Sequence, residues 1–124
     1  MSVGVTIDPG DPTPPYEQLR RQLATLIASG TLQAGERLAP VRQLAADLAL
    51  APGTVARTYR ELESAGLVDT RRGAGTIVRT SAKPMSAQER QRRLADLASD
   101  FVGQARLMGV ADEAIEAAVR DGLG

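Results

Sequence analysis

The 124-residue sequence predicts a mainly α-helical protein with one small β-hairpin. Three stretches with apolar residues at three- and four-residue steps predict helices, and a pair of short strand-like stretches separated by glycines follows them. Two more helical stretches close the chain. This order of elements is that of a winged helix-turn-helix domain followed by a short two-helix C-terminal tail. We expect the winged domain at residues 12–80 and the tail at residues 86–122.

The first helix is expected to begin near Tyr16, because a proline at the first helical position has no amide hydrogen to leave unpaired. The proline-rich segment before it leaves room for at most a short edge strand at residues 3–7. The second helix follows the turn Leu38-Ala39-Pro40, and a short connection separates it from a third helix that begins at Pro52. Such a short connection holds two helices at a steep angle.

The third helix is predicted to bury Val55, Tyr59 and Leu62, which recur at steps of four and three residues. The spacing of the apolar residues then changes from that of a helix to that of a strand. Two strands are expected, at residues 67–71 and 76–79. The glycines between them supply the positive φ angles that a tight turn needs. The hairpin would be the wing.

The tail is predicted to be helical and to form a homodimer. Residues 81–86 have the composition of a linker, and Ser86 with Glu89 forms a capping box that starts a fourth helix. A fifth helix is expected at residues 112–120, and an apolar stripe left in water favours association. The alternative is that the tail packs on its own winged domain. The predicted dimerisation residues are Leu94, Leu97, Phe101, Met108, Ile115 and Val119.

Composition excludes several classes of function. Fifteen basic and fifteen acidic residues cancel, and the chain has neither Cys nor His. The common nucleophile, the common general base and the usual zinc ligands are therefore missing, and we expect no enzyme, no metal and no cofactor. The apolar stretches are too short to cross a bilayer and no signal leader opens the chain, so we expect a cytoplasmic protein with no membrane partner.

Arginines are concentrated where a nucleic-acid surface would need them. A helix-turn-helix brings its second and third helices and its wing to one side, so a local basic surface can exist at zero net charge. Arginine can bind phosphate or guanine with two parallel hydrogen bonds. The N-terminal end of the third helix is the part that enters the major groove. The predicted DNA-binding residues are Arg42, Gly53, Thr54, Arg57, Thr58, Arg71, Arg72, Gly73, Gly75 and Thr76.

Some of these assignments have a purely structural alternative. The hydroxyl of Thr54 can cap the third helix, alone or together with a DNA contact, and the hairpin loop can be an ordinary solvated turn. For the whole chain, the alternative function is a winged-helix module that binds another protein and no DNA.

Several motifs resemble the GntR family of bacterial transcription regulators. They are Pro15–Leu19, Leu32–Leu38, Val41–Ala45, Leu62–Val68 and Arg72–Thr76. The segment Pro52–Glu63 and the short helical tail are similar to the YtrA-like subfamily. The resemblance implies a dimeric regulator of a transporter-type operon, with double-stranded operator DNA as its partner. It also implies that Arg42 and Thr54 contact DNA and that Gly73 and Gly75 are the wing glycines.

The sequence departs from the family pattern in three places. Pro52 stands where many members have arginine, and Ala51 and Gly53 stand where YtrA-like proteins have asparagine. Ala39-Pro40 replaces the Pro-Ser that precedes the second helix in the family, so a serine cap is missing there. We therefore expect Thr54, Arg57 and the wing to make more of the contacts that recognise the DNA bases. A tail this short has no evident cavity for a small-molecule effector, whose identity the sequence leaves open.

Overall fold

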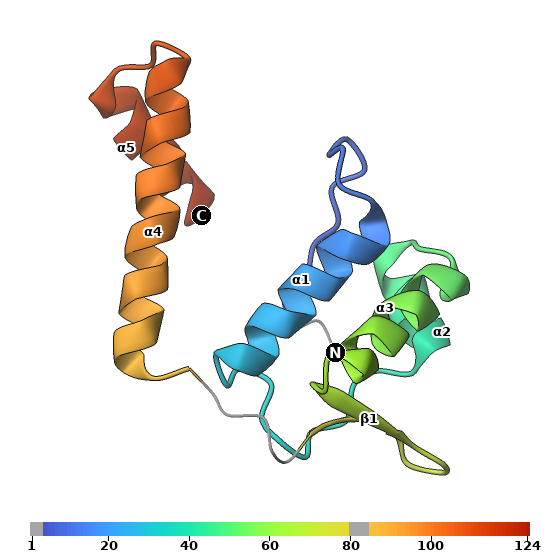
Figure 1. The fold of residues 1–124 in the computed structure, drawn as a ribbon. Coiled ribbons are helices and arrows are strands. Elements are labelled where there is room, and N and C mark those ends of the chain that lie inside the picture. The colour runs from blue at the N-terminus through green and yellow to red at the C-terminus, as the bar shows by residue number, and fades with distance from the viewer. Residues whose placement is uncertain (1–3, 80–84) are drawn as a thin grey trace. The chain divides into compact units, whose positions relative to one another are not determined.

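The computed structural model of the protein describes residues 4–79 and 85–124. The described part holds five helices and one antiparallel pair of strands, in the predicted order (Figure 1). The elements are α1 (Pro15–Ala28), α2 (Val41–Leu48), α3 (Pro52–Ser64), β1 (Val68–Arg71), β2 (Gly75–Val78), α4 (Ala87–Leu107) and α5 (Asp112–Gly122). The chain divides into two compact units, Met1–Met85 and Ser86–Gly124. Val3 of the predicted edge strand, Thr80 and residues 81–84 of the predicted linker lie outside the described residues.

An extended segment precedes α1 and is held by glutamine side chains. The Gln22 amide accepts a hydrogen bond from the Thr6 N–H at 3.0 Å and donates one to the Thr6 carbonyl at 2.7 Å. Gln18, one turn earlier on the same face of α1, bonds both backbone groups of Asp8 in the same way. Residues 5–8 form no strand, because these amides take the place of a neighbouring strand, and residues 9–13 form a turn and bends before α1.

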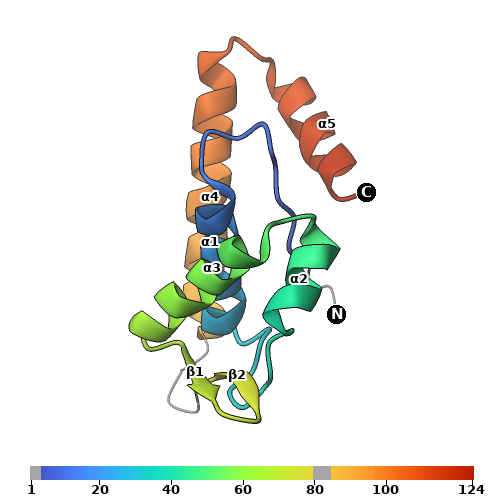
Figure 2. The same cartoon turned by 90° about the vertical axis from the view of Figure 1, so that its right-hand side faces the viewer.

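The core of the first unit lies where α1 and α2 pack on α3. Figure 2 shows α3 crossing α1, with the hairpin beside the C-terminal end of α3. The predicted inward residues of α3 are confirmed, since Val55, Tyr59 and Leu62 are all buried. Burying a large apolar side chain stabilises a fold by about 1.5–3 kcal/mol. The other buried apolar residues of this core are Val5, Leu19, Leu23, Ile27, Leu32, Leu38, Leu44, Ala45, Val68 and Val78.

A tight turn joins α2 to α3. Ala49 ends α2 with a left-handed backbone (φ 56°), and the Leu50 N–H donates to the Ala45 carbonyl at 2.8 Å. Ala49 is the one residue other than glycine with a positive φ in residues 4–79 and 85–124. α3 then begins at Pro52, as predicted.

The hairpin is joined by a third extended segment that the sequence did not reveal. β1 and β2 pair in the register Val68↔Val78 to Arg71↔Gly75, one residue displaced from the predicted strand ends. Arg37, in the loop before α2, forms an antiparallel bridge with Ile77 of β2. The Leu38 N–H donates to the Thr76 carbonyl at 2.8 Å, and the Val78 N–H donates to the Glu36 carbonyl at 2.8 Å. β2 is therefore paired on both edges.

The second unit consists of α4 and α5, which pack on each other. The predicted start of α4 is confirmed, because the Ser86 hydroxyl accepts a hydrogen bond from the Glu89 N–H at 3.1 Å. Ala105 of α4 and Ile115 of α5 are buried. Along the described ranges, no helix combines the length and the apolar character that crossing a membrane would require.

The predicted dimerisation residues divide into two groups. Leu94, Leu97, Phe101, Met108 and Val119 are exposed. Ile115 is only 7% exposed, so its assignment to a dimer surface was wrong: its side chain is already buried within the single chain. Val119 is 46% exposed, because α5 buries just one narrow face.

Candidate nucleic-acid interface

The N-terminal half of α3 has one exposed face, and the rest of its surface is buried or half-buried. Gly53 and Arg57 are exposed there, as predicted, and Thr54 is half-buried at the edge of this face. The N-cap residue of α3 is Ala51, which has no hydroxyl, so Thr54 is not the capping residue. Arg60 is also exposed, three residues after Arg57, and so lies on the same face.

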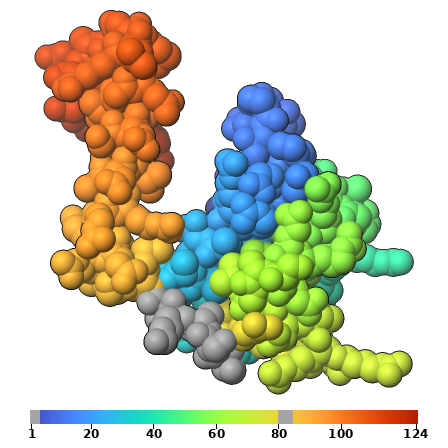
Figure 3. Space-filling model, in the orientation of Figure 1, coloured from blue at the N-terminus to red at the C-terminus, as the bar shows by residue number. Residues whose placement is uncertain are grey.

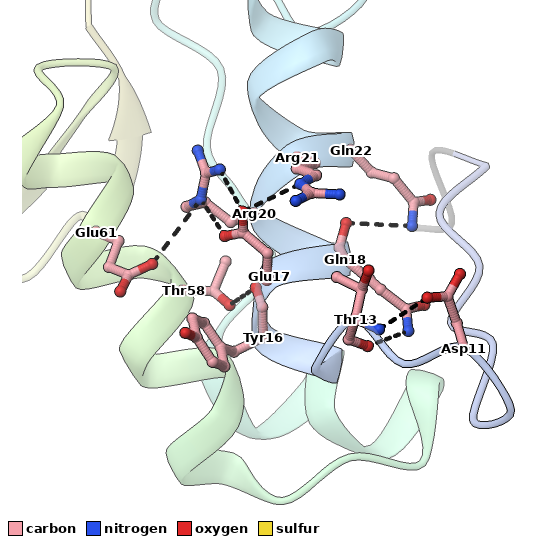
Figure 4. Close-up of polar contacts among 10 residues, drawn as sticks. All are labelled: Asp11, Thr13, Tyr16, Glu17, Gln18, Arg20, Arg21, Gln22, Thr58 and Glu61. Carbon is pink, nitrogen blue, oxygen red and sulfur yellow. Dashed lines mark hydrogen bonds and ion pairs between the residues drawn. The ribbon is translucent and has the colours of Figure 1, made fainter. Parts of the chain in front are cut away.

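Thr58 does not belong to this face. Its side chain is fully buried, and its hydroxyl donates a hydrogen bond to the Tyr16 carbonyl of α1 at 2.9 Å (Figure 4). The prediction that Thr58 faces outward was wrong, because residue 58 lies three residues after Val55 and four before Leu62 and therefore shares their buried face. Thr58 instead fixes α3 against α1.

Arg57 is held by residues of α1 and α3. Its guanidinium lies 3.7 Å from the centroid of the Tyr16 ring, a cation–π contact. Its Nε lies 3.5 Å from Glu61 Oε1, one helical turn further along α3. The side chain is nevertheless 53% exposed, so the guanidinium is oriented by these two contacts and remains accessible.

A wider ion-pair network continues from Glu61 to α1 (Figure 4). Arg20 Nε lies 3.9 Å from Glu61 Oε2 and 2.6 Å from Glu17 Oε1. The hydrogen bond from Arg20, with a second from Arg21, lowers the pKa of Glu17 to about 2. Arg20 thereby links Glu17 of α1 to Glu61 of α3, whereas Arg21 bonds Glu17 within α1 alone.

α2 presents Arg42 at its N-terminal end. Arg42 is exposed in the first turn of the helix. α2 has no side-chain cap at Pro40, as the missing serine predicted. The Tyr59 hydroxyl of α3 instead donates a hydrogen bond of 2.6 Å to the Ala39 carbonyl, directly before α2. Burial raises the pKa of Tyr59 to about 12, so this hydroxyl stays protonated at neutral pH.

The wing exposes Arg71, Arg72 and Gly73 at its loop, and Thr76 is half-buried. Gly73 and Gly75 both have positive φ (80° and 82°), which confirms the predicted need for glycine there. The Glu63 carboxylate at the end of α3 accepts a hydrogen bond from the Thr70 N–H at 2.9 Å. Because of this bond, the recognition helix and the wing are positioned together.

The predicted DNA-binding residues, apart from Thr58, therefore lie on α2, α3 and the wing of one unit. In Figure 3 part of α2 (teal) and the hairpin loop (yellow-green) project from the same side of this unit, with α3 (green) between them. Arg42, Arg60, Arg71 and Arg72 form no ion pair with any residue that the structure describes. Such unpaired guanidinium groups are available for phosphate or base edges.

Three residues of this region, Arg60, Tyr16 and Arg37, were not among the predicted DNA-binding residues. Arg60 could have been found from its spacing of three residues to Arg57 along the exposed face. Tyr16 gave no signal, because its contact with Arg57 joins helices far apart in the sequence. Arg37 belongs to the basic segment expected on the DNA-facing side, but its bridge to Ile77 gave no signal because it is a tertiary pairing.

The fold and these residues define a winged-helix DNA-binding protein, and comparisons with known proteins agree. Residues 15–78 match the model of the family described as bacterial regulatory proteins, gntR family. The chain is 33% identical over 106 residues to the HTH-type transcriptional repressor YtrA of Bacillus subtilis, covering 86% of this chain and 82% of that protein. It is 42% identical over 97 residues to the HTH-type transcriptional regulator Rv1152 of Mycobacterium tuberculosis, covering 78% and 75%.

A solved structure shows the same relationship. YtrA from Sulfolobus acidocaldarius, a GntR-family transcription factor, superposes with a TM-score of 0.58 at 26% identity, covering 79% of this chain and 97% of that one. The chain belongs to the GntR family and is YtrA-like. It is a transcriptional regulator with a winged-helix DNA-binding domain and is not an enzyme.

Proposed function

We propose that this chain is a homodimeric, sequence-specific repressor that binds double-stranded operator DNA through α2, α3 and the wing. The observation that supports this most directly is a set of four exposed arginines on these three elements that form no ion pair among the described residues: Arg42, Arg60, Arg71 and Arg72. Their support is rigid, because α3 is joined to α1, to the loop before α2 and to β1 by hydrogen bonds. A rigid scaffold with accessible cations is what sequence-specific binding needs.

Each element has its own role in this proposal. The N-terminal half of α3 enters the major groove, where Gly53 allows close approach and Thr54 and Arg57 reach base edges. Arg42 contacts the phosphate backbone beside this groove. The wing lies along the adjacent minor groove, with Arg71 and Arg72 on its phosphates.

The dimer is proposed to form through α4. Leu94, Leu97, Phe101 and Met108 follow each other at steps of three, four and seven residues, which is the spacing of a coiled-coil seam. Leu97 is 67% exposed, and the other three are exposed as well. Burying several such side chains in a partner's matching stripe contributes several kcal/mol at about 25 cal/mol per Å². A two-fold axis through this seam would present two recognition helices to a two-fold operator.

The proposed repressor role and the proposed target genes rest on similarity to related proteins. The Bacillus subtilis relative is named a transcriptional repressor. Occupying a promoter is the simplest way in which a compact DNA-binding dimer represses, and the YtrA-like subfamily suggests a neighbouring transporter-type operon as the target. The proposed location is the cytoplasm, where the operator is.

Binding is tested with the promoter upstream of the chain's own gene. A labelled duplex from this promoter should bind the full chain with an affinity that falls steeply as salt rises. Arg42→Ala should weaken binding at least tenfold. Arg21→Ala, which removes an exposed cation of α1 outside the proposed DNA-binding elements, should not. Equal behaviour of the two variants, or binding that is independent of salt, would favour the alternative of a protein–protein module.

The dimer is tested by sedimentation equilibrium at micromolar concentration. The full chain should sediment as a dimer, and Leu97→Asp should sediment as a monomer, because it places a charge in the seam. The matched control is Arg92→Lys, at an exposed position of the same helix, and it should leave the dimer intact. A wild-type monomer at this concentration would remove the dimer from the proposal.

A further inference from the structure

Arg37 is built into the wing although it precedes α2 by four residues. Its backbone bridges Ile77, and its neighbours Glu36 and Leu38 bond the backbone of β2 on either side of that pair. The loop segment around Arg37 thus pairs with the free edge of the two-stranded wing through an isolated bridge. β2 has β1 on one edge and Arg37 on the other.

The register decides which side chains share a face with Arg37. Paired residues of antiparallel strands point to the same side, so Arg37, Ile77 and Asp69 share one face. Side chains alternate along a strand, so Gly75 and its partner Arg71 belong to this face too. The opposite face holds Val68, Val78 and Leu38, which are buried in the core. Arg37 and Arg71 therefore lie on the outer face of the wing.

The side chain of Arg37 runs along the wing toward its loop. A Cβ built on Gly75 would lie 3.9 Å from the Arg37 Cδ and 4.0 Å from its Nε. Arg37 thus extends from its bridge at Ile77 over the bare backbone of Gly75, which is exposed. Arg71 flanks the same glycine from β1, since the two are paired.

Carboxylates offset the charge of this pair only in part: Arg71 interacts with Asp69 through its charge and makes no direct ion pair with it. The nearest acid on the outer face, Asp69, is bonded to Arg79 at 2.7 Å, and this bond lowers the pKa of Asp69. Arg37 and Arg71 form no ion pair within the described part of the chain. Two exposed guanidinium groups beside a glycine backbone form a concentrated positive site suited to an anion with several acceptor oxygens.

We propose that Arg37, together with Arg71, binds a backbone phosphate of the DNA duplex at the side of the wing. This inference rests on the proposed function, because it assumes that the wing lies in a groove. A hairpin in a groove directs its loop at the base edges and its flanks at the phosphate rows that border the groove. Arg37 lies on the flank and not in the loop, so its contribution is independent of sequence.

The test compares Arg37→Gln with Arg21→Gln in the full chain. Each is titrated with the promoter duplex and with a mixed-sequence duplex of the same length, over a series of salt concentrations. Glutamine keeps the Cβ and Cγ methylenes of Arg37 and removes the charge. Losing one phosphate contact per protomer should lower the salt slope by about 0.9 per protomer, or about 1.8 for the bound dimer, and the affinity by about five- to tenfold per protomer near 0.1 M salt, for both duplexes. Arg37→Lys should recover part of the slope, because it restores the charge but not the two-pronged geometry.

The outcomes separate this inference from the proposed function. A wild-type chain without salt-dependent DNA binding would contradict the proposed function itself. Wild-type binding as expected, with Arg37→Gln equal to Arg21→Gln, would overturn the inference alone. An Arg37→Gln loss confined to the promoter duplex would also overturn it, because a phosphate contact affects both duplexes. Thermal unfolding of each variant checks that the bridge at Ile77 is intact, since the backbone makes that pairing.

Discussion

The Arg57 guanidinium lies 3.7 Å from the centroid of the Tyr16 ring, so an exposed cation of α3 contacts the first turn of α1. The carbonyl of the same Tyr16 accepts the hydrogen bond of Thr58, the next residue of α3. One residue outside the helix-turn-helix thus positions two consecutive residues of α3, one facing outward and one buried. Tyr16 is a positioning residue for the DNA-facing surface.

The ring of Tyr16 should therefore matter for DNA affinity although it lies on α1. Tyr16→Ala should weaken binding to the promoter duplex by about two- to fivefold, because an exposed cation–π contact of about 0.5–1 kcal/mol no longer holds the Arg57 guanidinium in place. Tyr16→Phe keeps a ring under Arg57 and should bind as the wild type does. Fluorescence anisotropy with a labelled duplex measures both. Equal losses in the two variants would show that the hydroxyl, and not the ring, is what matters.

Thr58 and Thr54 should respond to the same substitution in opposite ways. Thr58→Val keeps the shape of the buried side chain but removes the hydrogen bond to the Tyr16 carbonyl, so the free energy of unfolding should fall by about 1 kcal/mol. DNA affinity should change by less than about twofold, because α3 keeps its hydrogen bonds through Tyr59 and Glu63 and Thr58 does not face the DNA. Thr54→Val should lower DNA affinity with little effect on stability, because this hydroxyl is half-buried at the edge of the exposed face. Urea unfolding and anisotropy titrations measure the two quantities, and a larger DNA-binding loss in Thr58→Val would return that residue to the interface.

Helix order and the buried apolar faces could be predicted because they depend on local periodicity and on proline and glycine positions. Pro52 starts α3 and Gly66, with a φ of 80°, follows its end, as their backbone preferences require. The position of Thr58 was predictable from the same periodicity: its spacing to Val55 and Leu62 is that of a core residue, but its polar side chain suggested the surface. A buried hydroxyl is stable there because the Tyr16 carbonyl accepts its hydrogen bond.

The tertiary parts of the candidate site could not be predicted. The exposed arginines of α2, α3 and the wing followed from helix and hairpin patterns. The bridge of Arg37 to Ile77 and the stacking of Arg57 on Tyr16 join segments separated by about 40 residues, which no local pattern reports. The burial of Ile115 similarly depends on how α5 packs within the single chain, since its spacing to Val119 fits a dimer surface equally well.

Acid should destabilise the first unit through Glu17. The hydrogen bond from Arg20 holds the pKa of Glu17 at about 2 in the folded chain, against an ordinary value of 4.5. The folded state therefore binds this proton less readily than the unfolded state, and the stabilisation is full above pH 4.5 and lost as pH falls toward 2. Glu17→Gln should flatten the fall of stability in this interval. Asp47→Asn, at an exposed position of α2, serves as the control and should keep the wild-type slope, as followed by circular dichroism at a series of pH values.

High pH should also destabilise the first unit, in this case through Tyr59. Burial raises the pKa of the Tyr59 hydroxyl from 10.0 to about 12, so the folded chain holds this proton more tightly than the unfolded chain does. The stabilisation is complete below pH 10 and is lost as pH rises to about 12. Tyr59→Phe should lower the free energy of unfolding by about 1–2 kcal/mol at neutral pH, because the Ala39 carbonyl loses its 2.6 Å hydrogen bond. The difference between wild type and variant should then shrink from pH 10 to 12 in urea unfolding, whereas a constant difference across this interval would show that Tyr59 does not titrate there.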